Sequence, residues 1–159
     1  MQKLIEGGIA RFHDDYRLTA PVTIDNPLED LLVDTNYEIF EEVLAKVLMN
    51  AWEAYDNKPT DPRPLSIHTR TVVKPDEGTF VELKVVDHGH GIEADVRDKM
   101  FEPFVSTKNT VGVGMGLTVA RHALRNLGGE VTMTDTPGGG ATAILMHPVE
   151  KKVKKSIED

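Results

Sequence analysis

Residues 81–92 have the sequence Val-Glu-Leu-Lys-Val-Val-Asp-His-Gly-His-Gly-Ile, and this stretch decides the fold. Apolar residues alternate with others at Val81, Leu83 and Val85, which is the pattern of a strand with one buried face. An aspartate and two glycines follow the strand directly. The stretch therefore predicts a strand that ends in an acidic side chain and a backbone free to adopt positive φ or to approach a ligand closely.

The same alternation predicts two β-hairpins. In the first, residues 65–69 precede the strand at residues 81–85, and Pro-Asp-Glu-Gly at residues 75–78 forms the turn between them. In the second, Val131–Thr134 and Ala141–Met146 flank a turn with three glycines. Both hairpins are expected to contribute antiparallel pairs to one sheet.

Helical periodicity predicts three helices. Glu38–Tyr55 is the strongest, because its apolar residues form a single stripe and most of its charged residues lie off that stripe. Met115–Leu127 is the second. A shorter helix is expected near residues 5–16, although Gly7 and Gly8 weaken it by about 1 kcal/mol each relative to alanine.

The order of the elements predicts the fold class. With a brief extended piece at Val22–Ile24, the order is helix, helix, hairpin, loop, helix, hairpin. This order favours an α+β fold, a two-layer sandwich with helices on one face of a mixed, mostly antiparallel sheet. We expect residues 1–149 to form a single domain with its core motifs at 38–148, and residues 150–159 to form a charged C-terminal tail.

The composition excludes several classes of protein. The 18 basic and 26 acidic residues give a net charge of -8, which disfavours binding to nucleic-acid backbones. The absence of cysteine excludes disulfides and thiolate metal sites. No apolar run reaches the roughly 20 residues of a bilayer span. We therefore expect a cytoplasmic domain without nucleic-acid or membrane contact.

The glycines are clustered in a way that indicates a nucleotide site. Dense backbone N–H groups ahead of a helix can hold a phosphate, although ordinary turns are the alternative explanation. The spacing matches neither a P-loop nor a Rossmann fingerprint. The three clusters are Gly89 and Gly91; Gly112, Gly114 and Gly116; and Gly138, Gly139 and Gly140.

Five short motifs occur in a fixed order along the chain. They are VLMNAWEA at residues 47–54, DHGHGI at 87–92, FEPFVSTK at 101–108, GVGMGL at 112–117 and GGGAT at 138–142. Each motif is weak alone, but their order makes chance an unconvincing explanation.

Together these motifs resemble the N, G1, F, G2 and G3 boxes of the ATP-binding domain of sensor histidine kinases. That family belongs to the GHKL superfamily, which also holds gyrase, the heat-shock-90 chaperones and MutL. The resemblance covers residues 38–148 and is closest to the nitrogen-sensor type, judging by the F box and the short lid between Lys108 and Gly112. It implies a fold of the histidine-kinase type, with ATP and Mg²⁺ as cofactors.

The resemblance assigns roles to five residues near the base and the metal. Asn50 would position Mg-ATP and supply a neutral oxygen to Mg²⁺, and Asp87 would recognise the adenine N6. Gly89 and Gly91 would let the chain pass beside the base, and Ile92 would contact it. Without the other boxes, a helix-surface asparagine and a turn aspartate would be the default interpretations.

Further residues are assigned to the lid and its surroundings. Phe101 and Phe104 would pack at the base of the lid, which core packing would explain equally well. The remaining nucleotide-binding assignments are Phe104, Lys108, Gly112, Gly114, Gly116, Leu117 and Thr142. For Thr142, the alternative is an ordinary strand residue of high β propensity.

Two features depart from the expected pattern. Hydrolytic members of the superfamily carry a glutamate base four residues before the asparagine, where this chain has Lys46. Lys46 is a catalytic candidate by position, but a protonated lysine is no general base near neutral pH, which argues against a gyrase-like or MutL-like hydrolase. The alternative is that Lys46 turns outward along its long stem. His88 and His90 form a His-x-His pair, which without a third ligand is weak evidence for a metal.

The resemblance implies a function whose acceptor lies elsewhere. None of the six histidines lies in an acceptor motif on paired helices. We expect the catalytic domain of a two-component sensor histidine kinase, inactive in autophosphorylation alone. It would deliver the γ-phosphoryl group to a histidine on the same kinase's dimerisation domain, for onward transfer to a response regulator. The alternatives are a stand-alone serine kinase of the anti-sigma-factor type and a non-catalytic, nucleotide-responsive interaction module.

Overall fold

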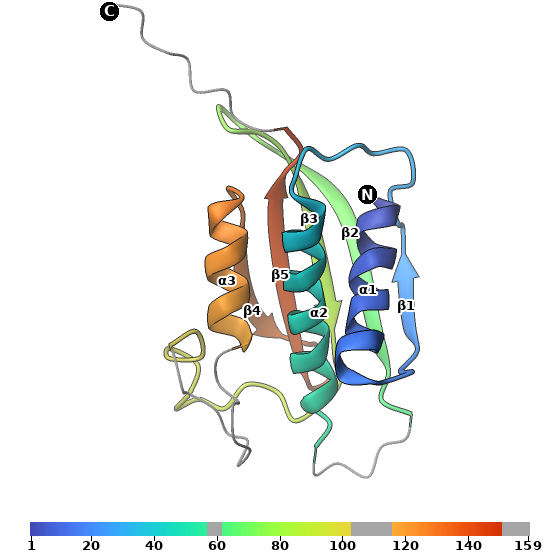
Figure 1. Ribbon diagram of the computed structural model, residues 1–159. Helices are drawn as coiled ribbons and strands as arrows, with labels where there is room; N and C mark the ends of the chain where they lie inside the picture. Colours follow the sequence, from blue (N-terminus) through green and yellow to red (C-terminus); the bar gives the residue numbers. More distant parts are fainter. Residues whose placement is uncertain (57–61, 103–115, 151–159) are drawn as a thin grey trace, which may run out of the picture.

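The computed structural model describes residues 1–56, 62–102 and 116–150. Within these residues, three helices lie on one face of a five-stranded sheet (Figure 1). The predicted two-layer α+β fold is confirmed. In chain order the elements are α1 (Gln2–Tyr16), β1 (Val22–Asp25), α2 (Tyr37–Glu53), β2 (Leu65–Lys74), β3 (Gly78–Val86), α3 (Gly116–Asn126), β4 (Glu130–Asp135) and β5 (Ala141–Pro148).

The sheet has the strand order β1-β2-β3-β5-β4. β1 pairs with β2 in parallel, and the other three pairs are antiparallel, as predicted. Both hairpins form where the alternation placed them. The turn between β2 and β3 uses positive φ at Asp76 (64°) and Gly78 (102°), and it brings Lys74 opposite Gly78.

Helix α2 lies at the centre of the helical layer. It begins after Asn36, whose side-chain Oδ1 accepts the N–H of Ile39 at 3.1 Å and so caps the first turn. It ends at Glu53, two residues before the predicted end at Tyr55. Just after this end, the carbonyl of Ala54 accepts the N–H of His90 from a distant loop, at 2.8 Å.

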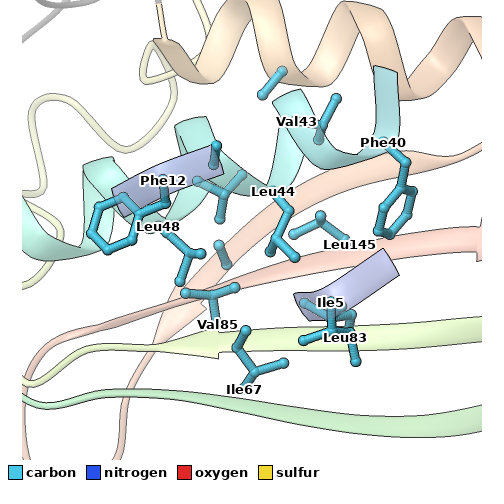
Figure 2. Close-up of a cluster of buried hydrophobic side chains, with 14 of the residues drawn as sticks. Ile5, Phe12, Phe40, Val43, Leu44, Leu48, Ile67, Leu83, Val85 and Leu145 are labelled. Carbon is cyan, nitrogen blue, oxygen red and sulfur yellow. The ribbon is translucent and has the colours of Figure 1, made fainter. Parts of the chain in front are cut away.

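The core lies between the helices and the sheet. α1 and α2 contribute Ile5, Phe12, Leu44 and Leu48, which face the strands (Figure 2). The matching strand residues Ile67, Leu83, Val85 and Leu145 are each no more than 1% exposed. Alternation along the strands places all of them on the one face that the helices cover.

The two glycines that weaken the sequence of α1 have a packing explanation. A Cβ at Gly8 would lie 2.6 Å from Leu44 Cδ2, so the bare backbone lets α1 approach α2 closely. A Cβ at Gly7 would meet the carboxylate of Glu41, whose Oε1 would be 2.2 Å away. The first obstacle is part of the buried core, whereas the second is the far end of a flexible side chain.

The predicted extent of the domain, residues 1–149, stays a prediction, and residues 151–159 of the tail lie outside the described residues. None of the helices in the described ranges has the length and hydropathy of a membrane-crossing segment.

The different surroundings of Gly7 and Gly8 give a pair of matched variants. Gly8→Ala should lower the free energy of unfolding by about 1–3 kcal/mol, because overpacking at Leu44 outweighs the gain in helix propensity. Gly7→Ala should raise it by up to about 1 kcal/mol, because Glu41 can move aside. Urea unfolding measures both, and a stabilised Gly8→Ala variant would contradict the packing explanation.

Candidate functional site

The motif residues that the structure describes gather at the end of the sheet where β3 ends and β5 begins. This end of the strands is called the site edge. β3 ends where β5 begins, with Val86 opposite Thr142 in the antiparallel pair. α2 ends and α3 begins at this same edge (Figure 1). Four element ends therefore meet, and each carries one of the predicted motifs.

Asp87 is the buried charge at this meeting point. It is only 2% exposed. Its Oδ1 accepts the N–H of Gly89 at 2.9 Å and the N–H of Ala141 at 3.1 Å. Burial raises the pKa of this carboxyl, although the two backbone N–H groups oppose the rise. Both hydrogen bonds that described residues donate to the carboxylate reach Oδ1, so Oδ2 is the oxygen left for a ligand.

Two glycines allow the chain segments to meet this closely. A Cβ at Gly89 would lie 2.2 Å from the carbonyl oxygen of Ala54 at the end of α2. A Cβ at Gly140, whose φ is 104°, would lie 2.1 Å from the carbonyl oxygen of Asp87. The resemblance assigned Gly89 to the base, but the close approach seen in the structure is to α2. Gly91 has a φ of 80°, which favours glycine at that position.

The end of α2 holds the loop that follows β3. The His90 N–H reaches the carbonyl of Ala54, and the His88 N–H reaches the hydroxyl of Tyr55 at 2.7 Å. The same hydroxyl donates to the carbonyl of Pro64 at 2.6 Å. Tyr55 was not among the predicted site residues, since nothing in a helical pattern shows which way a terminal tyrosine will point.

Asn50 lies one helical turn before Ala54, so its side chain is on the side of α2 that carries the loop contacts. It is half-buried. Lys46 lies one turn earlier, and its Nζ is 3.7 Å from Oε1 of Glu42. Because Glu42 is on the preceding turn, this ammonium points away from Asn50.

The start of α3 closes the edge on the other side. Thr118 Oγ1 donates to the carbonyl of Phe101, and the guanidinium of Arg121 lies 4.6 Å from the centroid of the Phe101 ring. These contacts attach the segment after β3 to α3. Arg97 adds a bidentate ion pair with Asp135 at the end of β4, at 2.9 and 3.1 Å.

A family model describing histidine kinase-, DNA gyrase B- and HSP90-like ATPases matches residues 35–151. The chain belongs to this ATPase family. The match begins just before α2 and includes all the motif residues described above.

Several proteins that are similar to this chain in sequence are sensor proteins. The chain is 44% identical over 75 residues to the sensor protein KdpD of Rathayibacter rathayi, covering 45% of the chain and 9% of KdpD. It is 30% identical over 146 residues to the C4-dicarboxylate transport sensor protein DctB of Rhizobium meliloti, covering 91% of the chain and 22% of DctB. The chain thus spans a small part of these relatives.

A solved structure shows the same architecture. The catalytic domain of histidine kinase ThkA, in a nucleotide-free form, aligns with a TM-score of 0.70 at 26% identity, covering 94% of this chain and 92% of that one. The histidine-kinase type of fold is therefore confirmed. The assignment to the nitrogen-sensor type stays a prediction.

Among the described site residues, the side chain of Thr142 lies on the face of the sheet opposite to that of Asp87. Ala141, Ala143 and Leu145 belong to the helix-covered face, so alternation places Thr142 on the opposite face. Its hydroxyl lies 2.9 Å from that of Thr136. The β4–β5 hairpin reaches Asp87 through the backbone N–H of Ala141, a contact that depends on register and not on residue type.

The other predicted residues divide into two groups. Ile92 and Leu117 are half-buried near the edge, and Gly116 is exposed, so that a Cβ there would meet no atom of the described residues within 4 Å. Four further predictions lie outside the described residues, namely Phe104, Lys108, Gly112 and Gly114. His88 and His90 are exposed, and the described residues contain no group of three or more potential metal ligands among His, Cys, Asp and Glu.

The buried carboxyl predicts a specific pH dependence. Because burial raises the pKa of Asp87 in the folded chain, the folded state binds a proton more readily than the unfolded state. The contribution of Asp87 to stability therefore rises as the pH falls through the folded pKa toward about 4, and is lost as the pH rises again. Asp87→Asn removes this contribution and keeps an Oδ1 for both N–H groups.

We expect Asp87→Asn at about pH 7 to equal or exceed the wild type in free energy of unfolding, because it removes a buried charge. On acidification toward about pH 4 the wild type should gain stability relative to the variant. Urea unfolding of both proteins across this range gives the difference directly. A wild-type advantage that shrinks on acidification would contradict the burial argument.

Proposed function

We propose that this chain is the ATP-binding catalytic domain of a two-component sensor histidine kinase. The observation that carries the proposal is the Asp87 carboxylate, which is 2% exposed and held through Oδ1 by two backbone N–H groups. Burying a carboxylate costs free energy, and a buried carboxyl whose pKa is raised by burial is a candidate for a functional group. The sensor-protein relatives and the catalytic domain of histidine kinase ThkA support the same assignment.

Asp87 would recognise the adenine base. An ionised carboxylate only accepts hydrogen bonds, and the exocyclic amino group of adenine donates them. With Oδ1 occupied by Gly89 and Ala141, Oδ2 is the oxygen for that contact. Gly91 and Ile92 continue the loop beside Asp87 and would contact the base.

Asn50 would hold the magnesium ion. Its amide oxygen is a hard, neutral ligand of the kind that Mg²⁺ accepts beside phosphate oxygens. Its place on α2, one turn before the loop contact at Ala54, suits a group next to the nucleotide. Bound Mg²⁺ supplies charge neutralisation on the phosphates. Lys108 and the glycines at 112, 114 and 116 would bind the triphosphate, as their motifs indicate.

The proposed reaction transfers the γ-phosphoryl group to a histidine of the dimerisation domain. The bond from the γ-phosphorus to the bridging oxygen breaks, a bond to an imidazole nitrogen forms, and ADP leaves. This chain's residues bind and orient ATP, and the receiving group belongs to the partner domain, from which a response regulator would take the phosphoryl group. Lys46 faces Glu42, which disfavours a role in activating water. A cytoplasmic location is part of this proposal.

The adenine assignment is tested by calorimetry with ATP. Asp87→Asn should lower the affinity by about 10- to 100-fold, because an amide donor can replace the acceptor that faces the adenine amino group. The matched control is Asp25→Asn, since Asp25 ends the edge strand β1, which does not pair with β3, and is exposed. Unchanged affinity in folded Asp87→Asn would show that this carboxylate does not read adenine.

The kinase assignment is tested by adding a histidine-containing dimerisation domain to the chain in trans. Asn50→Ala should reduce Mg²⁺-dependent transfer about 100-fold or more while adenosine affinity changes little, because a metal ligand is lost and no base contact. Asn126→Ala, at the exposed end of α3, is the control.

Three outcomes distinguish the possible activities. Labelling of the supplied histidine supports the proposal, and labelling of a protein serine instead would support an anti-sigma-factor-type kinase. Steady ATP hydrolysis by the unmodified chain, abolished by Asn50→Ala, would make it an ATPase in its own right. Binding without any transfer would support an interaction module.

A further inference from the structure

The hydroxyl of Tyr55 joins three segments of the chain. Tyr55 follows α2. Its hydroxyl donates to the carbonyl of Pro64 just before β2 and accepts the N–H of His88 just after β3. The side chain is 1% exposed. Burial raises the pKa of this phenol, so it stays neutral and can donate and accept at once.

The loop after β3 presents four successive backbone N–H groups, and each has a defined acceptor. Asp87 donates to the carbonyl of Ala141 at 3.0 Å, and Gly89 donates to the side chain of Asp87. His90 donates to the carbonyl of Ala54, and His88 donates to Tyr55. Among these four acceptors, Tyr55 is the one side chain that comes from outside the loop.

The contact with Tyr55 acts on the peptide group that directly follows Asp87. The N–H of that peptide is bound by the Tyr55 hydroxyl, while its carbonyl packs against Gly140, where a Cβ would lie 2.1 Å away. The orientation of this peptide is thereby fixed on both sides. Asp87 contributes the carbonyl of this peptide group. Fixing the peptide group therefore restricts the backbone of Asp87, from which the carboxylate extends.

The aromatic ring alone does not explain a tyrosine at this position. A phenylalanine would fill the same buried volume without bringing a hydroxyl out of water. The hydroxyl offsets that desolvation only by pairing with Pro64 and His88. Its contribution is therefore to the arrangement of the loop.

We infer that Tyr55 is a positioning residue for nucleotide recognition, which acts by holding the Asp87–His88 peptide and so aiming the Asp87 carboxylate at the base. The inference rests on the proposed function, because it requires that Asp87 binds the exocyclic amino group of a purine. It adds a residue outside the motifs to the site. Tyr55 itself touches the loop and is not required to touch the nucleotide.

The test compares ATP with inosine triphosphate, which has an oxo group in place of the adenine amino group. The wild type should prefer ATP, because a site built to accept a donor rejects an analogue without it. In Tyr55→Phe, ATP affinity should fall about tenfold while the affinity for inosine triphosphate changes less than about twofold. The preference for the amino group is the quantity that a merely structural role would leave unchanged.

Two controls separate positioning from lost stability. Tyr16→Phe removes a half-buried hydroxyl from α1, and Ile5→Val weakens the core away from the loop. Both should keep the wild-type ratio of the two affinities. If Tyr55→Phe alone does not fold, the same substitution is measured in the Gly7→Ala background.

The ratio of ATP affinity to inosine triphosphate affinity distinguishes the possible outcomes. An unchanged ratio in folded Tyr55→Phe, or equal losses for both nucleotides, would overturn the inference and leave the proposed function intact. A wild type that binds neither nucleotide would overturn the proposed function and, with it, this inference. Loss of the ATP preference in Tyr55→Phe alone would establish the positioning role.

Discussion

The fold at the site edge depends on one constraint, the burial of the Asp87 carboxylate. A charge in this position needs hydrogen-bond donors, and the chain supplies the N–H groups of Gly89 and Ala141. The first donor requires the loop to fold back on itself. The second requires the β4–β5 hairpin to end level with β3. A single carboxylate therefore relates the loop after β3 to the far hairpin, and it does so at the edge where α2 ends and α3 begins (Figure 1).

Much of the architecture follows from the sequence, because it rests on periodicity. The α2 stripe and the alternation in β2, β3 and β5 depend only on neighbouring residues and on which face is buried. The motif order also predicts Asp87 and the α2 asparagine as candidate site residues. Two details were beyond such reasoning. The close packing of α1 at Gly8 depends on the position of Leu44, and the direction of the Tyr55 hydroxyl depends on a loop far along the chain.

Thr142 illustrates how register limits prediction from motifs. A glycine-rich motif followed by threonine indicates a side chain near the base, yet a shift of one residue along a strand changes the face. In the structure the pairing of Val86 with Thr142 places Ala141 on the side of Asp87. The useful group at this position is a backbone N–H, which every residue except proline provides. Residue identity therefore carries little information about the contact.

On the proposed function, the arrangement of charges suits a domain that binds ATP without hydrolysing it. The carboxylate at the site is held by backbone N–H groups and suits a hydrogen bond to an amino group, not proton transfer from water. The residue one turn before Asn50 is Lys46, whose ammonium faces Glu42 and the start of α2. Neither side chain is placed to activate water. On the proposed function, the phosphoryl acceptor comes from another domain, so that transfer depends on docking and the chain alone retains its nucleotide.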